Sequence, residues 1–206
     1  MNSADEMKIL LEAVTPALTL ISVAVVIFQL RAITRQTKKD HERSRREVVL
    51  NLQKLWLEYC NDAKPRLIRS LLKSLDEDAC RKIWNNEPFS LPEKCKFLLS
   101  ILLDCDENKL TCKGNEVMID GHYAILFRAH LLNYLNLLEV IFTAWHDNIG
   151  DKGMIEREFG KNISQDGKVY PLDMMVNSAP AFPSIKKFSV YLRKKYEEPL
   201  LAKKPL

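Results

Sequence analysis

The feature that most constrains this chain is an apolar stretch near its N-terminus, from Ile9 to Leu30. Glu12 is the one charged residue within it. As an α-helix the stretch would be about 33 Å long, close to the hydrocarbon thickness of a bilayer. A secretory signal would start with basic residues and end at a small-residue cleavage site, whereas this chain starts MNSADEMK and continues with Arg31. We therefore expect residues 9–30 to be a transmembrane helix.

A basic segment follows at once. From Arg31 to Arg46 the sequence has seven Lys or Arg residues and two acidic residues. Because positive charge marks the cytoplasmic flank of a membrane span, we expect residues 1–8 outside the cytoplasm and the chain after Arg31 inside it. Residues 31–47 predict a solvated helical stalk near anionic lipid headgroups. Contact with RNA is the alternative explanation for this charge.

The polar residues of the apolar stretch fall into a regular series. Their steps of three, four, three and seven place them along one edge of a helix. This edge could contact neighbouring helices, line a wet pore made by several copies, or reflect chance in a plain anchor. The residues of this polar edge are Glu12, Thr15, Thr19, Ser22 and Gln29.

The remaining chain predicts an all-α cytoplasmic domain over residues 48–198 and a basic tail over residues 199–206. Apolar residues recur at helical spacing from Val48 to Tyr59, and Pro65 starts a further element. No strand pattern or internal repeat stands out. The expected fold class is therefore all-α: an N-terminal transmembrane helix that continues into a helical bundle, assembled as a ring-shaped homo-oligomer.

Other elements of the domain are predicted from local signals. Ser90 and Glu93 fit a capping box that opens a helix. The longest helix of the domain is expected from about His122 to Asp147, and it should be central because it is apolar almost all round. Further expectations are a loop or short hairpin at TCKGNEVMIDG, a short helix at DKGMIEREFG, a proline-rich loop at VYPLDMMVNSAPAFP, and a final helix over residues 184–198.

No familiar catalytic or cofactor motif is present in the sequence. The glycines are isolated, there is no HExxH pair, and the five cysteines include no CxxC. We therefore predict no metal, no cofactor and no enzymatic activity. The odd number of cysteines favours free thiols in a reducing compartment over a disulfide framework. These cysteines are Cys60, Cys80, Cys95, Cys105 and Cys112.

Two groups of polar residues are candidate sites. Arg128, Asn136 and Glu139 lie on the predicted central helix. Because buried charges are normally paired, they predict an internal polar cluster or a contact between subunits, with a nucleotide or RNA site as the alternative. Arg35 and His41 match the short pattern R-x5-H, in which an arginine could hold a phosphate and a histidine could move a proton. On an exposed stalk no cleft would orient either group, so a catalytic role is disfavoured.

The order of a single span, a basic stalk and a small all-α domain resembles a known family. With the stretches LLNYLNLLEVIFTAWHDNIG and DKGMIEREFG, the chain is similar to the membrane accessory proteins of type VI-B CRISPR loci, which have a divergent HEPN domain. The resemblance in layout covers most of the chain, and motifs carry it only over residues 132–160. Arg128 and His130 stand too close together to fit the Arg–His pair of HEPN ribonucleases.

The resemblance implies a role in antiviral defence at the bacterial inner membrane. It implies a homo-oligomeric pore that strengthens the response of an RNA-guided CRISPR nuclease by depolarising the membrane. Copies of the chain itself, membrane lipids and that nuclease are the expected partners. Two other functions remain open: a membrane-tethered adaptor that recruits a cytosolic partner, and a membrane-bound HEPN-type ribonuclease.

Overall fold

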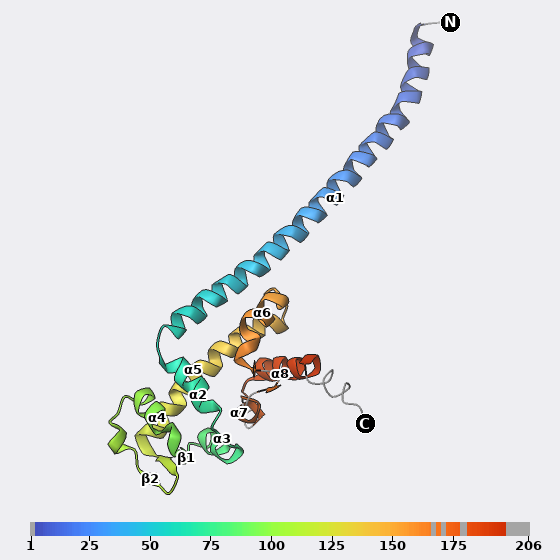
Figure 1. Ribbon diagram of the computed structural model, residues 1–206. Helices are drawn as coiled ribbons and strands as arrows, with labels where there is room; N and C mark the ends of the chain where they lie inside the picture. The colour runs from blue at the N-terminus through green and yellow to red at the C-terminus, as the bar shows by residue number, and fades with distance from the viewer. Residues whose placement is uncertain (1–2, 166–167, 170–171, 178–180, 197–206) are drawn as a thin grey trace, which may run out of the picture. The chain divides into compact units, whose positions relative to one another are not determined.

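The structure, a computed structural model, describes residues 3–165, 168–169, 172–177 and 181–196, with side chains from Ser22 onward apart from a few positions near the C-terminus. It is mostly helical (Figure 1). The chain divides into two units, Met1–Ser44 and Arg45–Leu206. The second unit is the folded domain, and its boundary lies near the predicted end of the stalk.

Eight helices and five short strands follow one another along the described part of the chain. They are α1 (Ser3–Cys60), α2 (Lys64–Leu72), α3 (Glu77–Trp84), β1 (Phe89–Pro92), α4 (Lys96–Leu102), β2 (Cys112–Lys113), β3 (Glu116–Ile119), α5 (Gly121–His146), α6 (Lys152–Phe159), β4 (Ser164–Gln165), β5 (Lys168–Val169), α7 (Leu172–Asn177) and α8 (Pro183–Tyr196). Short 3-10 turns cover Glu93–Cys95, Glu107–Lys109 and Gly160–Asn162.

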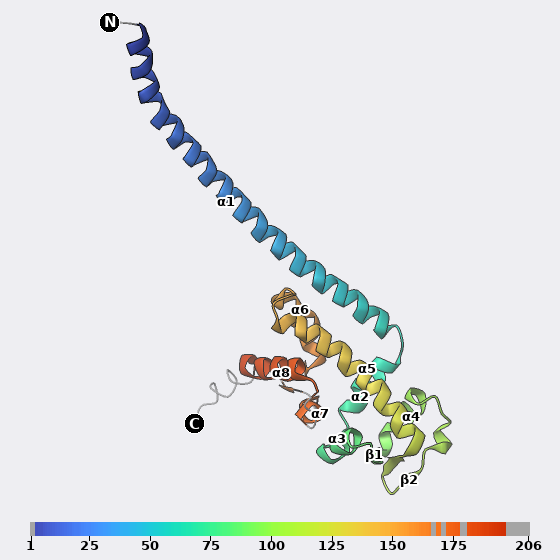
Figure 2. The same cartoon turned by 180° about the vertical axis from the view of Figure 1, so that it is seen from behind.

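Helix α5 is the centre of the domain, as predicted. Elements α3, α4 and β1 lie about its N-terminal half, and α6 and α8 lie along its C-terminal half (Figures 1 and 2). The ring of Phe142 stacks on Phe188 of α8 with centroids 4.1 Å apart, and Trp145 meets the same ring edge-on at 4.9 Å. Burying each such side chain stabilises the fold by about 1.5–3 kcal/mol relative to leaving it in water.

The last turns of α1 belong to this domain. Val49 and Leu52 are buried, and the Trp56 ring lies 6.0 Å from Tyr134 and 5.9 Å from Phe159. Arg45 Nε donates a hydrogen bond of 2.9 Å to the carbonyl oxygen of Asn148, in the turn after α5. The C-terminal end of the predicted stalk is therefore packed on the domain.

The segment at Ser90 differs from the prediction of a helix cap. Phe89–Pro92 is a strand that pairs antiparallel with β3, and β3 pairs with β2. The Ser90 hydroxyl donates to Glu116 Oε2 at 2.6 Å instead of capping a helix, and α4 begins only at Lys96. The hairpin of β2 and β3 confirms one of the two forms expected for TCKGNEVMIDG. The described part of the domain is thus mostly helical, with this three-stranded sheet and a two-stranded sheet of β4 and β5.

The proline-rich segment near the C-terminus also differs from the prediction of a loop. Leu172–Asn177 is the short helix α7, with Leu172, Met175 and Val176 buried. This helix packs near α3, where Trp84 Nε1 donates to the carbonyl oxygen of Met175 at 2.8 Å. The spacing of three and four between its buried residues was a helix signal that the flanking prolines hid.

Candidate functional site

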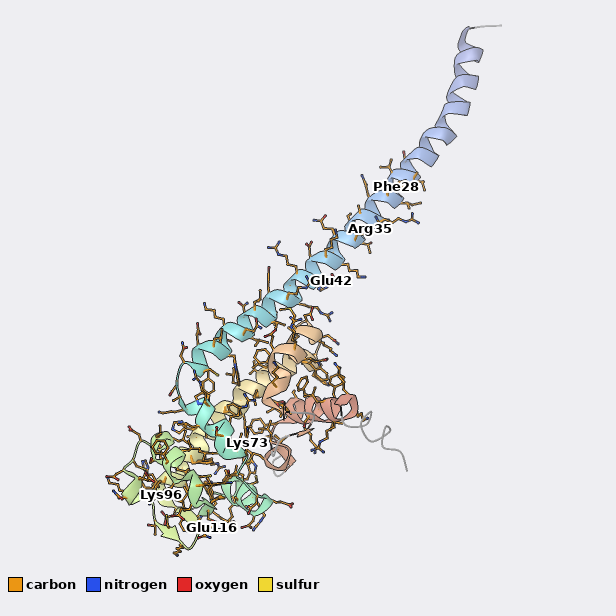
Figure 3. The ribbon with its side chains drawn as sticks, in the orientation of Figure 1. Phe28, Arg35, Glu42, Lys73, Lys96 and Glu116 are labelled. Atoms are coloured by element: carbon orange, nitrogen blue, oxygen red, sulfur yellow. The ribbon has the colours of Figure 1, made fainter. Side chains whose placement is uncertain are left out.

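The described part of the first unit is a helix with a large exposed apolar surface. The side chain of Phe28 is 70% exposed, that of Leu30 59% and that of Ile33 60%. Phe28 and Arg35 both project outward from the helix (Figure 3). Soluble proteins seldom leave contiguous apolar surface of this kind in water. Exposed apolar surface of this kind is typical of sites that contact lipid or another protein.

The polar edge predicted on this helix is described only in part. Glu12, Thr15 and Thr19 lie within α1, but their side chains are outside the described residues. Ser22 and Gln29 are exposed. Because α1 is a regular helix through this region, its geometry keeps these positions along one edge.

The apolar surface gives way to the basic segment without a break in the helix. Thr34 and Thr37 donate their hydroxyl hydrogens to the carbonyl oxygens of Leu30 and Ile33, at 2.8 and 2.9 Å. These bonds satisfy the two hydroxyl donors within the helix itself. The side chains from Arg31 to Glu47 are exposed.

Arg35 and His41 are both exposed on α1, and the helix does not bring them together. Six residues of α-helix separate them by about 9 Å along the axis and by roughly 120° around it. Such a pair cannot hold one substrate atom between them unless a second structural element orients both side chains. Their arrangement gives no support to the ribonuclease hypothesis.

Glu139 has a definite structural partner, which is not the predicted cluster. Its two carboxylate oxygens accept hydrogen bonds from the backbone N–H groups of Ser184 at 2.8 Å and Ile185 at 3.0 Å. These groups lie in the first turn of α8, where N–H groups have no partner within the helix. A negative charge is also favoured at this end by the helix dipole. Glu139 therefore caps α8 from across the core.

Arg128 and Asn136 do not join Glu139. Eleven residues put Arg128 on the same side of α5 as Glu139, but about 16 Å away along the axis. Arg128 is half-buried beside a small cavity, and Asn136 is exposed. The predicted buried cluster is therefore wrong, while the two alternatives, a contact between subunits and a nucleotide or RNA site, stay predictions.

The outward side of α5 carries a feature that was not predicted from the sequence. Its exposed residues recur at steps of four, four, three and four, and none of them is charged. We call this set the α5 strip. Side chains on a solvated helix face are usually charged, so an uncharged strip favours contact with another protein surface. The α5 strip consists of Ile125, Ala129, Asn133, Asn136 and Val140.

Within the described residues, α5 is the helix long and apolar enough to cross a membrane. Its large apolar residues, among them Phe127, Leu138 and Phe142, form the core of the domain. We therefore interpret α5 as a core helix. In the described part of the chain, no group of three or more His, Cys, Asp or Glu side chains is arranged to hold a metal ion.

Comparison with known proteins gives no relative. No protein-family model, curated protein or solved structure matches this chain.

Proposed function

We propose that this protein is a homo-oligomeric pore subunit of the bacterial inner membrane. The observation that carries the proposal is the exposed apolar surface of α1 around Phe28, next to the polar positions Ser22 and Gln29. The apolar side chains are suited to lipid. The polar edge is suited to the interior of a ring of helices, because polar side chains are tolerated at membrane depth when they face water or protein.

Two features support assembly of several copies. The polar edge of α1 would be costly to expose to lipid in a single chain, and association of helices removes that cost. The α5 strip offers a second, uncharged surface on the domain. Together they give each copy a contact within the membrane and a contact outside it.

The role in antiviral defence rests on the resemblance in sequence layout. In this role the pore would depolarise the membrane and strengthen the response of an RNA-guided nuclease. The basic residues between Arg31 and Ser44 would then lie at the cytoplasmic membrane surface, where each basic residue near anionic lipid contributes about 1 kcal/mol.

Ion flux through the purified protein in liposomes tests the pore directly. We expect flux above that of a variant whose residues 9–30 are scrambled. A triple variant in which Thr15, Thr19 and Ser22 are each replaced by Leu should still insert into the membrane but give a lower flux. These substitutions remove the hydroxyl groups of the polar edge without shortening the span.

The adaptor hypothesis predicts a different result for the same variants when they are tested in cells. A simple anchor would tolerate any span of equal length, so the scrambled and Leu variants would retain full function in cells. Flux no higher than that of the scrambled variant would refute the pore.

A further inference from the structure

A cavity of about 360 Å³ lies at the N-terminal half of α5, within the size range of small-ligand sites. The turn between α3 and β1 forms one wall and the first turns of α5 form the other. Pro88, Phe89, Ala124 and Ile125 give it an apolar lining. Phe89 is fixed in the core, because its ring lies 5.1 Å from Phe127.

Arg128 also lines the cavity. Within the part of the chain that the structure describes, the guanidinium of Arg128 makes no hydrogen bond or ion pair. Arg128 is half-buried, so part of the water that would solvate its side chain is removed. The acid of the same cavity, Glu87, accepts a hydrogen bond of 3.1 Å from Asn85 Nδ2 instead. The parallel N–H donors of the Arg128 guanidinium are therefore available for an oxyanion from outside the chain.

We propose that this cavity binds a small organic acid, with its carboxylate or phosphate on Arg128 and its apolar body against Ala124 and Ile125. An oxyanion accepts two parallel hydrogen bonds from a guanidinium, which fixes the orientation of the ligand. The negative charge of Glu87 disfavours a ligand that carries several negative charges. The preferred ligand is thus a compact acid with one oxyanion, and its binding does not depend on the proposed pore.

Benzoate, phenyl phosphate and benzyl alcohol are suitable probes for the full-length protein in detergent. We expect benzoate and phenyl phosphate to raise the unfolding temperature in a saturable way, and benzyl alcohol, which lacks the oxyanion, to have no such effect. Arg128→Gln should weaken benzoate binding at least about tenfold, because it removes charge-assisted hydrogen bonds. Glu87→Gln should strengthen binding of phenyl phosphate more than that of benzoate.

Arg157→Gln is the matched control. Arg157 is exposed on α6, where it pairs with the neighbouring Glu158 at 3.0 Å, so its replacement should leave benzoate binding unchanged. Arg128→Lys keeps the charge but loses the parallel N–H donors, and it should bind benzoate with intermediate affinity if the fold is intact by circular dichroism. The proposal is overturned if no probe gives a saturable shift, or if both Arg128 variants bind benzoate as the wild type does.

Discussion

Glu139 connects two helices that are far apart in the sequence, since its carboxylate on α5 caps the first turn of α8. Hydrogen bonds to a charged group contribute about 1.5–3 kcal/mol each when they are buried, and less when water reaches them. We expect Glu139→Ala to lower the free energy of unfolding by about 2 kcal/mol. Urea unfolding of the detergent-solubilised chain measures this change in the free energy of unfolding. Lys94→Ala, at an exposed position before α4, should change this free energy by less than about 0.5 kcal/mol; equal effects would contradict the capping role.

Glu156 on α6 makes stability depend on pH. Burial opposes its ionisation, but hydrogen bonds from Lys195, Tyr191 and Trp145 outweigh burial and lower the pKa of Glu156 below its ordinary value of 4.5. A carboxyl whose pKa is lowered by folding stabilises the fold fully above its unfolded pKa, and this contribution is lost as the pH falls through the folded value.

Glu156→Gln should therefore destabilise the domain by about 1 kcal/mol at pH 7, a modest figure because Lys195 is partly exposed to water. The difference from wild type should shrink as the pH falls below 4.5. Thermal unfolding of both proteins between pH 3 and pH 7 measures this. A difference that stays constant across the range would show that the charge of Glu156 is not what matters.

At the scale of elements, strong helical periodicity predicted the long helices, and pairing between distant segments decided the rest. Apolar spacing predicted helix α5. Pro65, as the predicted start of a further element, placed the end of α1 shortly before it. Ser90 lies in a strand and does not cap a helix, although its local sequence fits a capping box. Phe89 and Leu91 are buried at alternate positions of this strand, which pairs with β3. Partners remote in sequence determine such a strand.

The candidate sites show the same limit. Arg128 and Glu139 lie on one side of α5, but contact also requires nearness along the helix axis. The partner of Glu139 is the backbone of α8, 45 residues away from it in the sequence. A carboxylate alone does not reveal a backbone partner of that kind.

The α5 strip gives a prediction for that helix. Val140 is 55% exposed at the C-terminal end of the strip, so a charge there should cost the folded domain little. If the strip is a contact between copies, Val140→Glu should lower the mass of the detergent-solubilised particle, because an unpaired charge placed in an interface is costly. Lys186→Glu, on the exposed face of α8, serves as the control for charge at a site outside the strip. Equal particle masses for wild type and Val140→Glu would exclude the strip as a contact.

At the scale of the whole molecule, the two units have different requirements. The domain buries its own core around α5, whereas the apolar surface of α1 has no cover within the described part of its unit. In the proposed pore, lipid covers the apolar side chains and neighbouring copies cover the polar edge. The proposal therefore links assembly to membrane insertion.

The mass of the wild-type particle, measured by light scattering in detergent with the detergent contribution subtracted, is the decisive test of this link. We predict a closed assembly of several chains with a single, discrete mass. A monodisperse monomer that inserts into liposomes with its polar edge toward lipid would contradict the link, and the protein would then be a tethered helical domain.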